Sequence, residues 1–139
     1  MLTLAQANAI IDSALKASNS LKYKPMGVVV LDTAGHVIAS QRQDGASMFR
    51  LDIATGKSWA AIAMGASSRT LLQRAKDNPH FFSALASTAQ GKFLPQTGAV
   101  LIKDASGATI GAAGASGGTG DEDEQIVIAG IEAVGFTHG

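Results

Sequence analysis

Four consecutive acids, Asp121–Glu124, follow a glycine-rich turn at 114–120 and begin the last apolar segment of the chain. Acids here offset the positive end of a helix dipole, so the pattern predicts a helix start. Glycines before a helix usually present backbone N–H groups to a phosphate, but carboxylates take that place here. The turn therefore favours a neutral or cationic ligand, or a second subunit. Asp123 and Glu122 are the candidate proton-transfer groups, and the alternative is that they act only on the helix dipole.

Ser116, Gly117 and Thr119 lie in the same turn and are candidate ligand-binding residues. Glycine lets a ligand approach the backbone closely, and a serine hydroxyl donates a hydrogen bond to a ligand oxygen. No histidine is near Ser116 in the sequence, which disfavours a serine hydrolase. We therefore expect this turn to bind a ligand rather than to supply a nucleophile.

A second group of polar residues consists of Arg42, Asp44 and Gly45, with Lys57 further along the chain. An arginine fork binds a carboxylate through two hydrogen bonds, so Arg42 and Lys57 predict a site for a substrate carboxylate. Asp44 and Gly45 are assigned to the same ligand site. The alternative is a structural ion pair that fixes the first hairpin to the following helix.

The three histidines, His36, His80 and His138, have no His-x-x-x-His or Glu-x-x-His spacing. A preformed histidine metal cluster is therefore not expected, and a surface or capping role is the alternative for each. His80 precedes Phe81 and Phe82. It is therefore the best candidate among the three to contact a flat apolar ligand.

The chain has 139 residues, of which 46% are apolar and 16% charged, and its formal net charge is zero. This length predicts one domain over residues 1–139. The charge balance does not indicate nucleic acid or an anionic membrane as a partner. Few charges and many small residues favour contacts between copies, so we expect a homo-oligomer, a dimer or larger. Without a signal-peptide pattern or an apolar run long enough to span a bilayer, we expect a cytoplasmic protein. Without cysteine or spaced histidines, we expect no metal site.

Hydrophobic spacing predicts helices at 3–19, 50–64, 68–77 and 121–134, and a short helical stretch at 80–89. Apolar runs at 26–31 and 98–103 each lead through an Asp-x-x-Gly turn to a returning strand, at 36–42 and 108–113. Two such hairpins can make a four-stranded antiparallel sheet. The order of elements predicts an α+β fold in which helices pack on this sheet.

Several motifs follow in order along nearly the whole chain: Arg42-Gln-Asp44-Gly45-Ala46, Ile53-Ala54-Thr55-Gly56-Lys57, Gly111–Gly117, Asp123-Glu124 and Ala129-Gly130. Together they resemble the GlcG/HbpS family, which is described as haem-binding or haem-degrading and is related to the C-terminal domain of PduO-type proteins. The resemblance implies a profilin-like sandwich of an antiparallel sheet with flanking helices. It also implies assembly into dimers or rings, and haem or another tetrapyrrole as ligand.

Two functions are expected from these observations. The first is a small-ligand-binding protein whose ligand is haem or another tetrapyrrole. PduO-type relatives carry a haem-ligating histidine on the first helix, where this chain has none, so another residue must bind the iron. The second is an isomerase, lyase or hydrolase that uses Asp123, Glu122 and Lys57 in acid–base chemistry on a carboxylated metabolite. In either case we expect 114–120, the start of the last helix and 42–46 to converge at one sheet edge.

Overall fold

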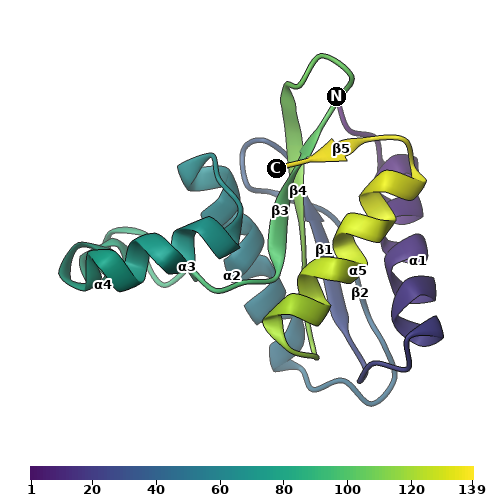
Figure 1. Cartoon of the computed structure of the whole chain (residues 1–139), viewed down its shortest axis with the longest axis horizontal. Coiled ribbons are helices and arrows are strands. Elements are labelled where there is room, and N and C mark those ends of the chain that lie inside the picture. The colour runs from purple at the N-terminus through teal and green to yellow at the C-terminus, as the bar shows by residue number, and fades with distance from the viewer.

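A computed structural model describes all residues, 1–139, and contains five α-helices and five β-strands (Figure 1). In chain order the elements are α1 (Leu4–Ser20), β1 (Gly27–Leu31), β2 (Val37–Arg42), α2 (Phe49–Met64), α3 (Ser68–Asp77), α4 (Pro79–Thr88), β3 (Ala99–Lys103), β4 (Thr109–Ser116), α5 (Gly120–Ala133) and β5 (Thr137–His138). The fold is α+β, as the order of predicted elements indicated. None of the helices combines the length and the hydropathy that crossing a membrane would need.

All strands belong to one antiparallel sheet in the order β2-β1-β4-β3-β5. Both predicted hairpins are present, and they join where β1 pairs with β4. Gly27 at the start of β1 lies between Arg42 of β2 and Ser116 of β4. β2 and β4 therefore run in the same direction and end at the same end of the sheet.

The residues of β1 alternate between two helical layers. Val28 and Val30 pack with α1 and α5 in the main core. Val29 and Leu31 face the other way and pack against Ala54 of α2. Figure 1 shows α1 and α5 side by side on one face of the sheet and α2 on the other. The sheet is therefore the middle layer of a sandwich, and every residue of β1 is buried.

Small residues let the helices approach the sheet and each other closely. A Cβ atom at Gly114 of β4 would lie 2.2 Å from Ser58 Oγ of α2. A Cβ atom at Gly130 of α5 would lie 2.3 Å from the carbonyl oxygen of Ile10 in α1. Real Cβ atoms do not approach other atoms so closely, so both positions require glycine for packing. These contacts determine how closely α2 packs on β4 and α5 packs on α1.

Helices α3 and α4 project from the side of the sandwich, to the left in Figure 1. They enclose a small core in which Phe82 and Phe93 pack with Leu71 and with Ala60 of α2. Phe81 is half exposed, and its ring meets that of Phe82 edge to face, with the centroids 5.7 Å apart. The projecting pair is therefore held to the rest of the molecule mainly through α2.

Three elements differ from the sequence prediction. Strand β4 continues through residues 114–116, which we assigned to the turn, because β1 pairs with this segment along its whole length. Helix α4 begins and ends one residue earlier than the predicted stretch at 80–89, because Pro79 is favoured in the first turn of a helix. Strand β5 was not predicted; Thr137 and His138 pair with β3, and two residues are too few for a periodic pattern. The sheet therefore has five strands instead of four.

Candidate functional site

Lys57 and Asp123 form a buried ion pair between α2 and α5. Lys57 Nζ lies 3.0 Å from Asp123 Oδ2 and donates a second hydrogen bond, of 3.1 Å, to the carbonyl oxygen of Ala115 in β4. Asp123 Oδ1 accepts a 2.9 Å hydrogen bond from the backbone N–H of Gly118. Only 4% of the Lys57 side chain and 2% of the Asp123 side chain are exposed. The pair therefore ties two helices, a strand end and the glycine turn together without facing solvent.

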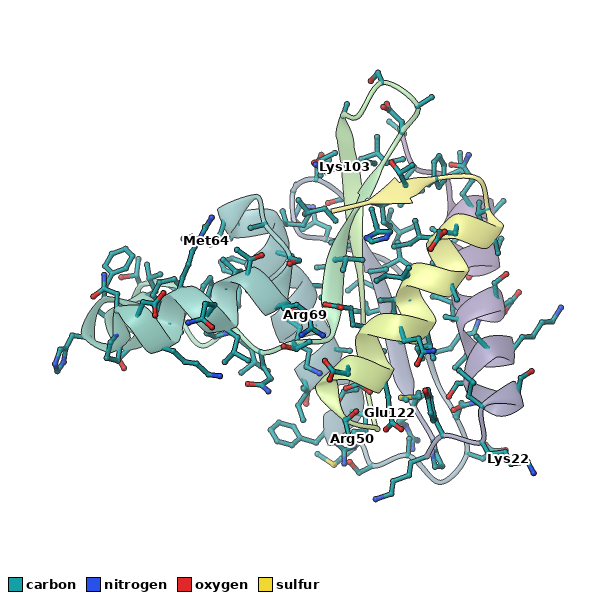
Figure 2. The ribbon with its side chains drawn as sticks, in the orientation of Figure 1. Lys22, Arg50, Met64, Arg69, Lys103 and Glu122 are labelled. Atoms are coloured by element: carbon teal, nitrogen blue, oxygen red, sulfur yellow. The ribbon has the colours of Figure 1, made fainter.

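The remaining acids of 121–124 also have partners. Asp121 and Glu124 both accept hydrogen bonds from the Arg69 guanidinium of α3, which lies beside the start of α5 in Figure 2. The bond to Asp121, followed by that to Glu124, raises the pKa of Arg69 above its usual value. Glu122 and Thr119 form a capping box, in which each side chain accepts the other residue's backbone N–H. None of the four acids is left as an unpaired base.

The sequence Gly-Ala-Ser-Gly-Gly at 114–118 matches the Gly-x-Ser-x-Gly pattern of hydrolases, which our sequence analysis missed. Ser116 is nevertheless buried, and its Oγ accepts a 3.3 Å hydrogen bond from Arg50 NH1 of α2. No side-chain hydrogen bond joins Ser116 to a histidine. Ser116 therefore has the environment of a structural hydroxyl.

Arg50 is a residue that sequence reasoning missed. It lies in the first turn of α2, where a cation is unfavourable to the helix dipole, and it is labelled near Glu122 at the lower end of the sheet in Figure 2. A basic residue at a helix start was the one available signal. Its partner is 66 residues away in the sequence, so spacing alone gave no reason to pair them.

The glycines of the turn pack against the protein itself. A Cβ atom at Gly117 would lie 2.2 Å from the carbonyl oxygen of Pro25, and one at Gly120 would lie 2.9 Å from Thr97 Cβ. The close approach that the sequence analysis assigned to a ligand is therefore made by neighbouring segments of the chain. Gly117 and Thr119 are accounted for by packing and capping.

Arg42 and Asp44 lie at the same end of the sheet but in a separate place. They line a depression of about 450 Å³ between the end of α1 and the end of β2. Gly45 follows them in the loop with a φ of 87°, a left-handed conformation that favours glycine. Lys57 is committed to Asp123, so Arg42 and Lys57 do not form the shared carboxylate site that we expected. The backbone segments 42–46 and 114–120 therefore lie at the same end of the sheet, as predicted. Their side chains nevertheless form two separate environments, the depression at Arg42 and the buried pair at Asp123.

His36 lines a larger depression, of about 620 Å³, at the opposite end of the first hairpin. Its other lining residues come from the β1–β2 turn, the middle of α2 and the loop after α4: Ala34, Gly35, Asp52, Thr55, Gly56, Trp59, Gly91 and Lys92. The side chain of His36 is 80% exposed, and its Nδ1 lies 3.8 Å from Asp32 Oδ2. His36, which the sequence did not distinguish from a surface histidine, thus lies at this depression.

The other two histidines are less enclosed. His80, our preferred contact for a flat ligand, is exposed at the start of α4, and its neighbour Phe81 also points to solvent. His138 lies in the edge strand β5 and lines a smaller depression of about 330 Å³. No group of three His, Asp or Glu side chains in the molecule is arranged to hold a metal ion.

The fold and these contacts define a class of protein, an α+β sandwich built from two hairpins and joined at its glycine turn by a buried Lys–Asp pair. The chain belongs to the HbpS-like family: the family model described as haem degrading protein HbpS-like matches residues 2–132. A comparison with curated proteins gives no match.

Solved structures of similar proteins support this assignment. A PduOC–haem complex is 26% identical, with a TM-score of 0.83 over 95% of this chain and 94% of that chain. A double mutant of HbpS from Streptomyces reticuli is 27% identical, with a TM-score of 0.83 over 96% of this chain and 87% of that chain. The ORFY protein of Klebsiella pneumoniae is 23% identical, with a TM-score of 0.85 over 95% and 89%, and shows a shared fold. The haem relation is thus established at the level of the family.

Proposed function

We propose that the protein binds haem, with His36 as the ligand of the iron, in the depression between the β1–β2 turn, α2 and the loop after α4. The observation that carries the proposal is the position of His36 at this depression. Membership of the HbpS-like family and similarity to a protein solved with haem support haem as the class of ligand. The bound group would supply an iron centre that takes an imidazole nitrogen.

The surroundings of His36 suit a metal ligand. Its Nδ1 faces the carboxylate of Asp32, while its backbone N–H and that of Ala34 donate to Asp32 Oδ1. Asp32 Oδ2 lies 3.8 Å from Nδ1, beyond hydrogen-bond distance, so the carboxylate is a nearby negative charge on this side of the ring and leaves Nε2 to bind a metal. The hydrogen bond from the His36 backbone, the largest cause, lowers the pKa of Asp32 below its usual value.

The volume of the depression and two of its side chains, Trp59 and Lys92, suit a ligand with an aromatic ring system and acidic groups. A volume of about 620 Å³ lies within the usual range for small-molecule sites, roughly 300–1,000 Å³. Trp59 offers an aromatic surface for a macrocycle, and Gly91, which has open space around it, lets the ligand approach the backbone. Lys92 offers a charge for a propionate, whereas Asp52 repels one, so the propionates belong at the Lys92 end.

The enzymatic alternative lacks comparable support. It assigned proton transfer to Asp123, Glu122 and Lys57, and these groups are engaged in a buried pair and a helix cap. An acid or base in catalysis must reach a proton on the substrate. We therefore propose binding, and no turnover chemistry at these residues.

A haem titration of histidine variants tests the proposal. His36→Ala is expected to lower haem affinity at least about tenfold and to remove the shift of the Soret band, because metal-site groups contribute on that scale. The exposed side chain of His36 makes loss of folding an unlikely cause of any change, and circular dichroism checks it.

His80→Ala and His138→Ala are the matched controls and should bind like the parent. If all three variants keep the parental Soret shift, the ligand is not a histidine and the proposal is wrong. Loss of the shift in His80→Ala alone would move the site to α4 and equally reject the His36 depression.

A further inference from the structure

Trp59, the only tryptophan of the chain, packs against two separate hydrophobic cores. One is the small core between β1 and α2, formed by Val29, Leu31 and Ala54. The other is the core that the projecting helices α3 and α4 enclose against α2. Trp59 is the one residue that the two cores share. Because side chains in such cores pack closely, the position of the indole ring is fixed from both sides.

The β1–β2 turn rests on the free edge of this ring. A Cβ atom at Gly35 would lie 3.0 Å from Trp59 Cδ1 and 3.1 Å from Trp59 Nε1. Gly35 has a φ of 82°, and its backbone N–H donates a 3.1 Å hydrogen bond to the carbonyl oxygen of Asp32, which closes the turn. His36 is the next residue. The position of its backbone therefore depends on where the indole holds the turn.

The second hairpin has the same turn without this support. The backbone N–H of Gly107 donates a 3.0 Å hydrogen bond to the carbonyl oxygen of Asp104, and the φ of Gly107 is 84°. Gly107, however, has open space where Gly35 meets the indole. An Asp-x-x-Gly turn thus forms equally well without an aromatic neighbour. The contact of Trp59 with Gly35 is therefore not needed to form the turn, and it can serve to fix where the turn lies.

We infer that Trp59 is a positioning residue for the iron ligand, because its ring edge holds the turn that carries His36 at the depression. This inference rests on the proposed haem site. Histidines that bind metals are usually oriented by a hydrogen bond from the second ring nitrogen. His36 lacks one, since its Nδ1 lies 3.8 Å from Asp32 Oδ2. Its placement therefore depends on the backbone of the turn, which Trp59 supports through Gly35.

A pair of glycine variants tests the contact in the absence of haem. Gly35→Ala and Gly107→Ala introduce the same backbone strain in the same kind of turn, but only the methyl group at position 35 meets Trp59. Gly35→Ala should therefore shift the emission maximum of Trp59 fluorescence, and Gly107→Ala should leave it at the parental wavelength. Parental emission in both variants would show that the turn does not rest on the indole and would overturn the inference.

Haem titrations of the full chain test the role of the contact. Trp59→Leu and Gly35→Ala should each weaken haem binding at least about threefold and alter the Soret shift, because both displace the ligand, whereas Gly107→Ala should bind like the parent. In combination with His36→Ala neither should weaken binding further, since a positioning residue acts only through the group that it positions. If Trp59→Leu weakens binding equally with and without His36, Trp59 acts by direct contact with haem and the inference is wrong.

The outcomes separate this inference from the proposed function. Parental haem binding in His36→Ala would reject the His36 site itself, and the positioning role with it. A tenfold loss in His36→Ala, together with parental binding in Trp59→Leu and Gly35→Ala, would reject the positioning role alone. Circular dichroism checks that each variant is folded. If Trp59→Leu does not fold, Gly35→Ala alone and in combination with His36→Ala decides the question.

Discussion

At the scale of single residues, the molecule is organised around one buried charge pair. Lys57 and Asp123 satisfy each other, and Ala115 and Gly118 supply the remaining hydrogen bonds. Such a pair contributes little net stability relative to apolar residues, but removing one partner leaves a charge in a medium of low polarity. Its effect is therefore greatest when it is broken.

Replacing Lys57 alone should destabilise the protein strongly. Lys57→Met leaves the Asp123 carboxylate buried without its cation, and the free energy of unfolding should fall by about 3–5 kcal/mol. The double variant Lys57→Met/Asp123→Asn should regain most of this loss, because an asparagine oxygen still accepts from Gly118 without a charge. Urea unfolding followed by Trp59 fluorescence measures both.

The matched control is Arg69→Met, which removes the half-exposed pairs with Asp121 and Glu124. Exposed pairs contribute about 0–1 kcal/mol, so this variant should remain close to the parent. If Lys57→Met is no more destabilising than Arg69→Met, the pair between α2 and α5 is not desolvated as described.

Several site residues could be identified from sequence, but their roles could not. Asp123 and Lys57 were selected for their charge, and their pairing depends on how β4 and α5 lie against α2, which no local pattern encodes. His36 was recognised only as a histidine after a turn. Its depression is completed by Trp59 and Lys92, which arrive from two later elements. The chemical character of each candidate residue could thus be predicted from its type, whereas the residues that it contacts could not.

At the scale of elements, a turn or helix start could be predicted from sequence where its side chains form hydrogen bonds with residues close by in the chain. The two hairpin turns are the clearest case: Asp32 accepts from Ala34 and His36, and Asp104 accepts from Ser106 and Ala108 in the same spacing. The capping box at the start of α1 is likewise local. The sheet order and β5 depend on contacts between distant segments, and they were not predictable in this way.

The contact between α1 and α5 gives a prediction at this scale. On helix propensity alone, Gly130→Ala would stabilise α5 by about 1 kcal/mol. A methyl group there would lie 2.3 Å from the Ile10 carbonyl oxygen, so we expect a net loss of about 1–3 kcal/mol in urea unfolding.

Gly107→Ala provides the comparison, because it has open space around it and a φ of 84°. It should lose about 1–2 kcal/mol from backbone strain alone, without a change in helix packing. A stabilised Gly130→Ala variant would show that the two helices are further apart than described.

At the scale of the whole molecule, the exposed apolar side chains bear on assembly. Met48 and Phe49 precede and begin α2, Phe81 lies on the projecting α4, and Val37 lies on the open edge strand β2. Large apolar groups of this kind are common at contacts between subunits. Assembly of copies into an oligomer therefore remains our prediction.

Light scattering of the purified chain at micromolar concentration should give a mass at least twice 14.1 kDa. Contacts of this composition are apolar, so 0.5 M salt should leave the mass unchanged, whereas an assembly held by charges would dissociate. A mass of one chain at both salt concentrations would contradict the prediction.

The pairing of β1 with β4 has a consequence for how the chain acquires its structure. These two central strands come from the first and last quarters of the sequence, and α1 similarly packs on α5. Bringing such distant segments together requires closing a long loop, which slows folding. During synthesis, one edge of the apolar strand Gly27–Leu31 remains unpaired until β4 has been made, when nearly the whole chain has left the ribosome. Protection of that edge in the nascent chain is therefore a condition for producing this protein.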